Sequence, residues 1–389
     1  MKLVFVTASL VHGGAERHTI ALANRLAERG HECHAAYVRN DPSQLGRLRH
    51  DVSAQCLHAR RYLDFGALGR LRALLARLRP AAVVAANPYA MMYAALALAR
   101  SSLRAPLAVT FHTTLLSGAK EWLKMLYYRP LFWSADCLVF VCDAQRHHWL
   151  PRLVGARAQR VIYNGIDTEH WRSPGPEVRT GVRRALGLAD DDYVIGLCAV
   201  LRPEKNPLQL LEALARLRGR GIAARALLIG DGPMRPAIEA RARALGVAGE
   251  VAIAGLHDDV RPLLAAADTA ALCSISETFP LAALEAMALG RPVVLPAVGG
   301  VPEMVRPGRE GLLFPVGDTG ALVERIAALA DARLRRRMGA AARATVEARF
   351  TERAMVDSYE RLLAELATGK RENLVPGMRM IEGDNRGSK

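Results

Sequence analysis

Short apolar runs alternate with amphipathic stretches along most of the chain. In the first half, the runs that predict β-strands are Leu3–Ala8, His34–Val38, Ala81–Ala86, Leu107–Phe111 and Leu138–Cys142. In the second half, they are Tyr193–Ala199, Arg225–Ile229, Val251–Ala254, Thr269–Cys273 and Val293–Pro296. Stretches with helical periodicity separate these runs, and Gly13-Gly14 opens the first predicted helix, which ends at Gly30. Because strands separated by helices form parallel sheets covered on both faces, the pattern predicts an α/β fold with two doubly wound, Rossmann-like domains.

The two sets of strands indicate where the domains meet. Turn residues cluster at Asn164–Pro176, so we expect a first domain over 1–165 and a second over 166–350. We expect a helix over 351–367 that crosses back to the first domain, and a disordered tail over the polar, glycine-rich segment 368–389. Ligands of such sheets bind at the carboxyl edges, which we expect to face one another across a cleft.

One uncharged stretch needs weighing as a membrane span. Residues 80–99 carry no charge, but they are mostly alanine, and Asn87-Pro88 divides them into a predicted strand and a predicted helix over Tyr89–Arg100. The first seven residues are too short for a secretory signal. We therefore expect a cytoplasmic protein without a transmembrane helix.

The charge is unevenly distributed. The 389 residues include 53 Lys and Arg against 38 Asp and Glu, a net charge of +15. Residues 1–165 hold 22 basic and 9 acidic side chains, a balance of +13, whereas the remainder holds 31 and 29. This asymmetry indicates a polyanionic partner: nucleic acid, an anionic membrane or a phosphate-bearing substrate. The alternative is that these arginines lie on solvated helix faces and bind no partner.

The strongest chemical signal lies in residues 274–288. A predicted strand ends near Cys273, a loop carries Glu277, and Pro280 stands where the first residue of a helix is expected. The free N–H groups of Leu281 and the next two residues would then form a seat for phosphate. Glu285 follows among apolar neighbours, where a carboxylate is costly unless something binds it. Two carboxylates beside a phosphate seat suit a ligand rich in hydroxyl groups.

The spacing of Glu277 and Glu285, E-x7-E, resembles the signature of retaining glycosyltransferases of family 4, which have the two-Rossmann-domain GT-B fold. Six further segments also resemble that family and appear in its order; together they extend from about residue 3 to 350. They are Gly13-Gly14-Ala15-Glu16, Val109-Thr110-Phe111-His112, Asn164-Gly165-Ile166-Asp167, Leu201-Arg202-Pro203-Glu204-Lys205-Asn206, Gly230-Asp231-Gly232-Pro233 and Gly299-Gly300-Val301-Pro302-Glu303.

The resemblance implies roles for the donor side of the site. Glu277 would bind hydroxyls of the donor sugar, the backbone of Phe279, Pro280 and Leu281 would hold sugar and diphosphate, and Glu285 would bind the ribose. Lys205 would neutralise the departing diphosphate. The family's arginine five residues before this lysine is replaced by Val200, and Arg202 is a candidate to compensate; a solvated turn is the other interpretation of Arg202 and Lys205.

On the acceptor side, the resemblance places His112 beside the reacting sugar and Gly13, Gly14 and Glu16 near the acceptor or a phosphate. Catalysis would then depend on His112, Glu277 and Lys205. A structural hydrogen bond by His112, and an ordinary strand–helix turn at the glycines, are the alternatives.

The sequence predicts neither a metal nor a cofactor. The six cysteines form no C-x-x-C pair and mostly lie in apolar runs, so we expect reduced thiols without disulfides or zinc. Residues 190–192 are three aspartates with the D-x-D spacing that other glycosyltransferases use for manganese, but they precede a strand and are interpreted as a turn at the amino edge. The resembled family uses no metal at this step.

The activity implied is transfer of a hexosyl unit with retention from a nucleoside diphosphate sugar, with UDP-sugars favoured and GDP-mannose second. The acceptor would be a saccharide or lipid-linked saccharide in bacterial cell-surface polysaccharide, lipopolysaccharide or glycolipid synthesis. A basic acceptor domain suits an anionic membrane surface, with Arg60-Arg61, Arg70, Arg72, Arg77 and Arg79 as candidate contacts. The basic, aromatic helix Lys120–Arg129 either lies at this interface or packs on the core.

Two other functions remain open on the sequence alone. One is an epimerase or phosphorylase on a similar fold. The other is a basic protein that binds nucleic acid, which we do not expect because interleaved aromatics and a recognition motif are missing. Salt-dependent binding to DNA, compared with saturable binding to UDP or GDP, discriminates these classes.

Overall fold

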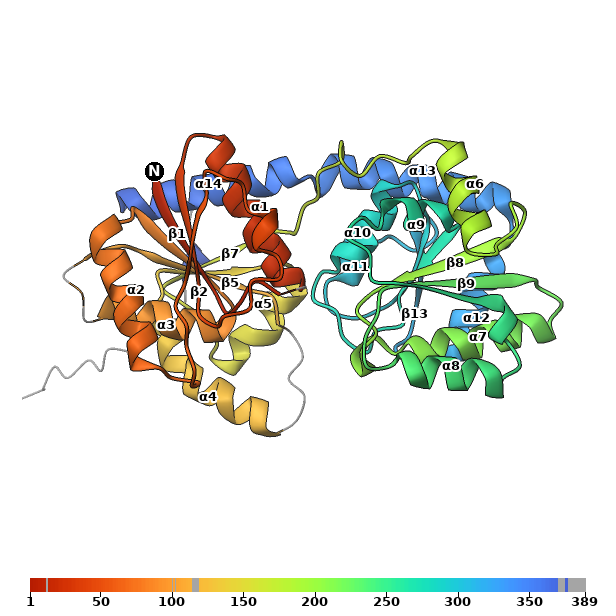
Figure 1. Ribbon diagram of the computed structural model, residues 1–389, viewed down its shortest axis with the longest axis horizontal. Helices are drawn as coiled ribbons and strands as arrows, with labels where there is room; N and C mark the ends of the chain where they lie inside the picture. The colour runs from red at the N-terminus through yellow and green to blue at the C-terminus, as the bar shows by residue number, and fades with distance from the viewer. Residues whose placement is uncertain (12, 100, 102, 114–118, 370–374, 377–389) are drawn as a thin grey trace, which may run out of the picture. The chain divides into compact units, whose positions relative to one another are not determined.

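The computed structural model describes residues 1–11, 13–99, 101, 103–113, 119–369 and 375–376. The chain forms two compact units (Figure 1). The N-terminal unit contains Met1–Tyr163 and Val356–Lys389, and the C-terminal unit contains Asn164–Met355. The N-terminal unit is therefore built from two separate pieces of sequence.

The N-terminal unit contains an eight-stranded sheet with the order β14-β7-β6-β5-β4-β1-β2-β3. Neighbouring strands are parallel except β14, which is antiparallel to β7. The order reverses between β1 and β4, which is where ligands bind in open sheets of this kind. The strands are β1 (Lys2–Thr7), β2 (Glu32–Tyr37), β3 (Ser53–Cys56), β4 (Ala82–Ala86), β5 (Leu107–Phe111), β6 (Cys137–Phe140), β7 (Ala158–Val161) and β14 (Val375–Pro376).

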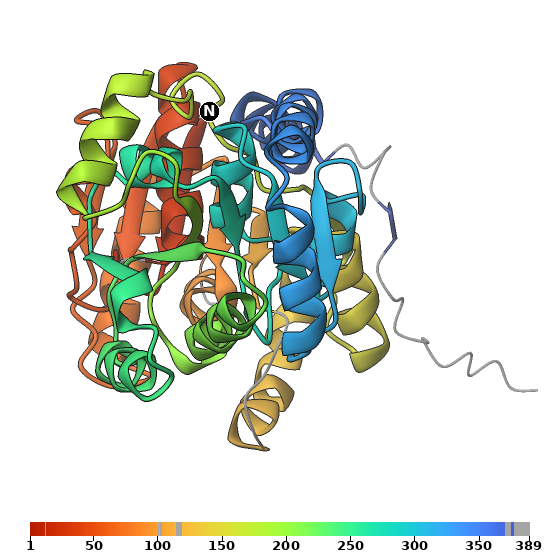
Figure 2. The ribbon, with the colours of Figure 1, turned by 90° about the vertical axis from the view of Figure 1, so that its right-hand side faces the viewer.

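Helices cover both faces of this sheet. Val4 and Val6 of β1 share one core cluster with residues of α2, α3 and α4, and Figure 1 shows α4 and α14 on opposite sides of the sheet. In both views α4 lies at the outer edge of its unit (Figures 1 and 2). The helices are α1 (Gly14–Glu28), α2 (Phe65–Leu78), α3 (Asn87–Ala99), α4 (Ala119–Ser134), α5 (Asp143–Trp149) and α14 (Glu352–Thr368), with short 3-10 turns η1 (Leu45–Arg47) and η2 (Leu150–Arg152).

The C-terminal unit contains a six-stranded sheet with the order β10-β9-β8-β11-β12-β13, in which all neighbours are parallel. Here the order reverses between β8 and β11. Figure 1 shows α7, α8 and α12 on one face and α6, α9 and α10 on the other. The strands are β8 (Tyr193–Cys198), β9 (Ala224–Ile229), β10 (Val251–Gly255), β11 (Thr269–Ala271), β12 (Val293–Pro296) and β13 (Gly311–Phe314).

Most helices of this unit follow directly on a strand. They are α6 (Pro176–Ala185), α7 (Pro207–Gly219), α8 (Arg235–Ala244), α9 (Arg261–Ala266), α10 (Leu281–Ala288), α11 (Val301–Met304), α12 (Thr319–Ala328) and α13 (Ala332–Arg349), with 3-10 turns η3 (Pro203–Lys205) and η4 (Ala248–Glu250). The structure confirms the predicted α/β fold with two doubly wound, Rossmann-like sheets.

The chain enters and leaves the C-terminal unit side by side. The N–H of Ile166 donates to the carbonyl of Phe350 at 3.0 Å, and the N–H of Glu352 donates back to Ile166 at 2.8 Å. A side chain at Gly165 would collide with the backbone of Thr351. The Asn164–Asp167 motif thus provides a close backbone approach that only glycine permits at its second position.

Within the N-terminal unit, helix α14 is anchored by charged groups. Arg29 pairs with both Asp357 and Glu360, each at 2.6 Å, and His31 Nε2 lies 2.7 Å from Glu360 Oε1. Burial of Tyr359 and Leu363, both 0% exposed, completes the attachment.

Several predicted element ends need correction. The helix predicted over Tyr89–Arg100 begins at Asn87, and position 100 itself lies outside the described residues. The strand predicted over Leu138–Cys142 ends at Phe140, because Cys142 caps α5: its Sγ accepts from the N–H of Gln145. The strand predicted over Thr269–Cys273 ends at Ala271.

The predicted disordered tail is described only in part. Helix α14 continues to Thr368, and Val375–Pro376 pairs with β7. Residues 370–374 and 377–389 of that prediction lie outside the described residues.

Candidate active site

Lys205 and Glu277 come from the two strands between which the order of the C-terminal sheet reverses. The chain leaving β8 turns through η3, which ends at Lys205, and the chain leaving β11 forms the loop that carries Glu277. The Lys205 Nζ atom lies 2.6 Å from Glu277 Oε1, and the Ser274 hydroxyl donates to the same oxygen at 2.7 Å. Both contacts engage Oε1, so neither of these groups commits Oε2. The structure thus brings together two residues that lie 72 positions apart.

The loop of Glu277 rests on the Gly299-Gly300 pair. Gly299 has a φ of 56°, and a side chain there would collide with the carbonyl oxygen of Glu277. The N–H of Gly300 donates to the carbonyl of Thr278 at 2.8 Å. The glycine pair therefore allows the backbone of the Glu277 loop to pack directly against the segment that follows β12.

The loop of Lys205 rests in a similar way on the segment after β9. The N–H of Leu201 donates to the carbonyl of Asp231 at 3.0 Å. A side chain at Gly230, whose φ is 130°, would collide with the carbonyl of Ala199. The two glycine motifs of this unit thus hold the loops that carry the predicted donor-binding residues.

Arg202 differs from Lys205 in its surroundings. Its side chain is 55% exposed, and its Nη1 atom lies 3.9 Å from Glu204 Oε1, a loose pair on the surface. Val200 is half-buried. The proposal that Arg202 compensates for Val200 stays a prediction.

Helix α10 begins at Leu281, one residue later than predicted. Pro280 is the N-cap, with φ −70° and ψ 118°, and is not the first helical residue. The N–H groups of Leu281, Ala282 and Ala283 still point out of the amino end of the helix. As in any α-helix, these first groups have no acceptor within the helix. The Asn164 side chain donates to the carbonyl of Phe279 at 3.0 Å and so fixes the approach to the helix.

Glu285 lies in the second turn of α10 and is 1% exposed. Its neighbours Leu284 and Met287 are fully buried. The sequence predicted a carboxylate set among apolar residues, and the structure places it there. A buried carboxylate at this depth requires polar partners, which a bound ligand's hydroxyls can add to.

The predicted acceptor-side residues follow β1 and β5 in the N-terminal unit. Gly13 is the N-cap of α1, Gly14 is its first residue, and the Glu16 carboxylate lies so close to Gly13 that a side chain on the glycine would collide with it. His112 follows β5. Its backbone N–H donates to the side-chain oxygen of Asn87, the residue directly after β4, at 2.9 Å.

His112 has a histidine neighbour that the sequence reasoning missed. The ring of His18, on the buried face of α1, lies edge-on to the His112 ring with centroids 4.7 Å apart. The centroid of the His18 ring also lies 5.4 Å from that of the Tyr359 ring, again in an edge-on arrangement. Burial lowers the pKa of His112 to about 4, and burial followed by the neighbouring His112 lowers the pKa of His18 well below its usual value. Both rings are therefore neutral at pH 7.

Three further contributors were not predicted as site residues. Ser274, Asn87 and Asn164 each hold a predicted site residue or its backbone. The position directly after a strand, which all but Asn164 share, is the signal that would have drawn attention to them. His18 carries a different signal, since it falls on the apolar face of a predicted helix four residues after Gly14.

The three aspartates at 190–192 form a turn around a buried arginine. Arg183, which is fully buried, donates to the carbonyls of Ala189, Asp190 and Asp192 and pairs with Asp268 at 2.9 Å. A guanidinium occupies the inner side of the turn considered for manganese. Among the described residues, no group of three or more His, Cys, Asp or Glu side chains is arranged to hold a metal ion.

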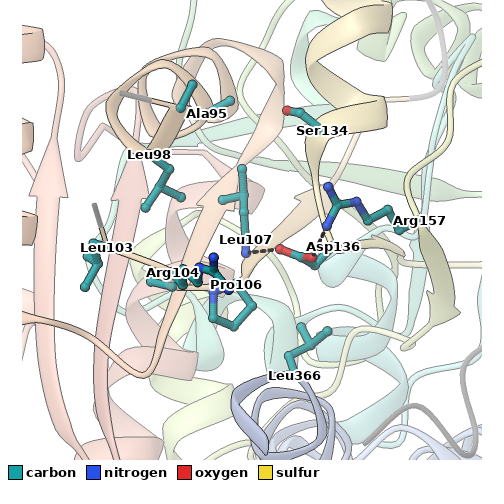
Figure 3. A pocket seen from close by; sticks show the side chains of 12 residues that line it. Ala95, Leu98, Leu103, Arg104, Pro106, Leu107, Ser134, Asp136, Arg157 and Leu366 are labelled. Atoms are coloured by element: carbon teal, nitrogen blue, oxygen red, sulfur yellow. Dashed lines mark hydrogen bonds and ion pairs between the residues drawn. The ribbon is translucent and has the colours of Figure 1, made fainter. Parts of the chain in front are cut away.

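A cavity of about 500 Å³ lies elsewhere in the N-terminal unit, at the amino end of β5 (Figure 3). On one side of the cavity Asp136 accepts from the N–H of Leu107 at 3.0 Å and pairs with Arg157 at 3.2 Å. The other side includes Leu98, Leu103 and Arg104. None of the predicted site residues lines this cavity.

Two family models match this chain and cover the two halves. Residues 12–170 match Glycosyltransferase Family 4, and residues 178–345 match Glycosyl transferases group 1. The chain belongs to the family 4 glycosyltransferases. It is 32% identical over 259 residues to EpsD of Bacillus subtilis (strain 168), which is named a glycosyltransferase; the match covers 64% of this chain and 67% of the relative.

Two further relatives of this glycosyltransferase have more specific names. It is 33% identical to N-acetyl-alpha-D-glucosaminyl L-malate synthase of Bacillus anthracis, over 52% of each chain. It is 32% identical to D-inositol 3-phosphate glycosyltransferase of Mycobacterium tuberculosis (strain F11), over 69% of this chain and 59% of that one. The chain thus spans only about half to two thirds of the length of these relatives.

Solved structures share the fold of this glycosyltransferase. The Anabaena protein HepE, crystallised with UDP-glucose, superposes with a TM-score of 0.83 at 23% identity and covers 94% of this chain and 100% of its own. Sucrose-phosphate synthase from Thermosynechococcus elongatus gives 0.81 at 21% identity, over 95% of this chain and 100% of that one. These matches identify the two sheets as the GT-B fold.

Proposed function

We propose that this glycosyltransferase moves a hexosyl unit with retention from a nucleoside diphosphate sugar, with UDP-sugars favoured over GDP-mannose. The acceptor we propose is a saccharide or lipid-linked saccharide of bacterial cell-surface polysaccharide or glycolipid synthesis, reached at the cytoplasmic face of the membrane. No helix among the described residues is long and apolar enough to cross a bilayer. HepE, a protein of the same fold, has been crystallised with UDP and with UDP-glucose.

The observation that carries the proposal is the contact between Lys205 and Glu277 beside the amino end of α10. An ammonium group next to a helix N-terminus favours a diphosphate, because both present positive charge and N–H donors. Lys205 and Ser274 both contact Oε1 of Glu277, and a carboxylate has further capacity to accept hydrogen bonds from sugar hydroxyls. Phosphate and sugar recognition therefore meet at one edge of the C-terminal sheet.

In the proposed reaction, the bond between the anomeric carbon and the diphosphate oxygen breaks, and the acceptor oxygen bonds to the same face of that carbon. The acceptor's proton passes to an oxygen of the departing diphosphate. Lys205 stabilises the negative charge that develops on that diphosphate, and Glu277 holds the sugar. A neutral His112 acts as a hydrogen-bonding group that positions the sugar and not as a cation.

The test is thermal denaturation with UDP, GDP, ADP and their sugars, with and without EDTA. A nucleotide present at a hundred times its Kd stabilises the protein by about 2.7 kcal/mol, which is a shift of several degrees. We expect UDP to stabilise the wild type, EDTA to make no difference, and Glu285→Gln to abolish the shift. Glu324→Gln is the matched control, since Glu324 is exposed and pairs with Arg220.

Product analysis completes the test. Release of UDP together with a new glycoside of the donor's anomeric configuration supports the proposal, whereas an altered free nucleotide sugar would identify an epimerase. A wild type that no nucleotide stabilises would contradict the proposed donor site.

A further inference from the structure

Helix α4 is apolar on two opposite faces, although only one of them packs against the protein. Met125, Tyr128 and Phe132, spaced three and four residues apart, are at most 5% exposed and belong to the core cluster shared with α3. This face satisfies the packing requirement of a helix in an α/β unit. Of the two interpretations of this helix that the sequence allowed, packing on the core is therefore confirmed for one side of it.

The other face of α4 is apolar and remains in solvent. Trp122 is 38% exposed, Leu123 68%, Leu126 50%, Tyr127 54% and Trp133 44%. Large apolar side chains that share a surface at this exposure usually mark an interaction site.

The patch continues onto neighbouring elements. Exposed Tyr62 hydrogen-bonds to buried Tyr128, whose ring lies 5.6 Å from the ring of exposed Tyr127. The Trp133 indole donates to the carbonyl of exposed Leu153 at 3.2 Å. We call the five exposed side chains of α4, together with Tyr62 and Leu153, the α4 surface. It contains seven of the twelve large hydrophobic side chains that are exposed in the described part of the chain.

The described charged side chains around the α4 surface are almost all positive. Lys124, Arg60, Arg61 and Arg152 are exposed, and the Arg152 guanidinium lies 6.0 Å from the centre of the Trp122 ring. Among the described side chains of 59–65, 122–134 and 149–154, Asp64 is the single carboxylate, and it is used to cap α2.

Two other predicted contacts are used inside the fold. The Arg70 guanidinium donates to the carbonyl of Leu57 and that of Arg72 to the carbonyl of Leu96. Arg70 and Arg72 are therefore weaker candidates for an external contact than the exposed basic side chains beside α4.

We propose that the α4 surface docks this glycosyltransferase onto an anionic lipid bilayer. Trp and Tyr prefer the level of the lipid headgroups, leucines enter the acyl region, and lysine and arginine meet anionic headgroups. A second copy of the chain fits less well, because pairing two α4 surfaces would bring their basic side chains together. Single-stranded nucleic acid would use the aromatic rings but would leave Leu123 and Leu126 in water.

The inference rests on the proposed function in one respect. The membrane contact would give access to the lipid-linked acceptor that we propose. It also explains how a chain whose described helices do not span a bilayer reaches that acceptor.

The experiment is co-sedimentation of the full chain with vesicles of phosphatidylcholine and phosphatidylglycerol in a 7:3 ratio, without nucleotide. We expect binding that falls in 0.5 M NaCl and on pure phosphatidylcholine, because salt and neutral headgroups remove the electrostatic part. The double variant Leu123→Ser/Leu126→Ser should lose at least tenfold in partitioning, whereas the control Val316→Ser, a 42% exposed residue of the C-terminal unit, should not.

Both variants should keep the wild-type melting temperature and UDP shift, since they replace exposed side chains distant in sequence from the donor loops. Vesicle binding that the double variant retains would overturn the proposal, as would wild-type protein that dimerises through α4 or binds oligonucleotides but not vesicles. Vesicle binding without any nucleotide shift would contradict the proposed function and leave the membrane surface intact.

Discussion

Glu277 is held by two groups with different consequences. The Lys205 ammonium forms a salt bridge with one oxygen of the carboxylate, and the Ser274 hydroxyl donates to the same oxygen and so fixes its orientation. In the proposed reaction Lys205 would turn toward the diphosphate, because its side chain is 28% exposed whereas that of Glu277 is 8% exposed. The carboxylate is the fixed member of the pair and the ammonium the adjustable one.

This asymmetry separates two variants. Lys205→Met should weaken UDP itself by roughly ten- to a hundredfold, the cost of one charged hydrogen bond. Glu277→Gln should bind UDP as the wild type does but lose most of the extra affinity that the sugar of UDP-glucose provides. Isothermal titration with UDP and UDP-glucose measures both. Equal losses for the two ligands in Glu277→Gln would contradict its sugar-binding role.

The buried histidine pair makes stability depend on pH. Both rings are neutral when folded, and the pKa of His112 is lowered to about 4. The unfolded chain takes up these protons near pH 6.5 while the folded chain does not, so stability falls as the pH drops from about 6.5 toward 4. Each histidine contributes a slope of up to about 1.4 kcal/mol per pH unit.

The substitution His18→Phe keeps an aromatic ring at this position but removes one titrating group. Urea unfolding between pH 7 and 5 should therefore show a shallower loss of stability than in the wild type. His257→Gln, at an exposed histidine, should follow the wild-type slope. Parallel curves for all three proteins would show that His18 titrates normally.

At the scale of elements, apolar runs were enough to find the strands that are buried on both faces. Strands β1, β4 and β8 consist almost wholly of apolar residues and were predicted to within one or two residues. The sequence analysis missed β13, β14, β3 and β7, and the sequences of the last two, SAQC and AQRV, mix polar and small side chains. The strand form of β3 and β7 comes from pairing with β2 and β6, which no local pattern reveals.

The candidate site divides in the same way. Motif spacing located Lys205 and Glu277, whose contact follows from two neighbouring strands at the reversal of the sheet. Asn164 and His18 act through partners more than 90 residues away, so their roles depend on tertiary structure. Proline is typical of the first helical position, where Pro280 was predicted, but Pro280 is the N-cap, one residue earlier.

Arg183 on α6 is the clearest departure from expectation at this scale. An arginine in a polar, amphipathic helix is expected to be solvated, yet this one is fully buried with Asp268 and several carbonyls. We expect Arg183→Met to destabilise the C-terminal unit by about 3–5 kcal/mol, because it leaves those carbonyls and part of a charge unpaired.

The adjacent Arg184→Met is the matched control, since Arg184 is exposed on the same helix. It should change the free energy of unfolding by about 0.5 kcal/mol or less. Chemical denaturation followed by circular dichroism compares the two. Equal stability of both variants would show that the buried network contributes little.

At the scale of the whole molecule, the C-terminal residues belong to the N-terminal unit. Val356, Tyr359, Leu362 and Leu363 of α14 are at most 2% exposed. Burying such side chains contributes about 1.5–3 kcal/mol each, which together approaches the whole stability of a domain.

A chain that ends at Met355 should therefore fold its C-terminal unit and leave the N-terminal unit open to protease. A chain that ends at Gly369 keeps α14 and should resist protease as the full chain does. Limited proteolysis with mass spectrometry identifies the surviving fragment. A protected N-terminal unit in the shorter chain would show that α14 is dispensable for its folding.

The interrupted N-terminal unit has a consequence for synthesis on the ribosome. Its first 163 residues emerge early, but α14 follows only after the 192 residues of the C-terminal unit. At about 5–20 residues per second, this delay lasts on the order of 10–40 s. During that time the surface that receives Tyr359 and Leu363 is uncovered, although the sheet beneath it has already been made. The nascent chain thus offers a binding site for chaperones that the finished protein closes with its own last helix.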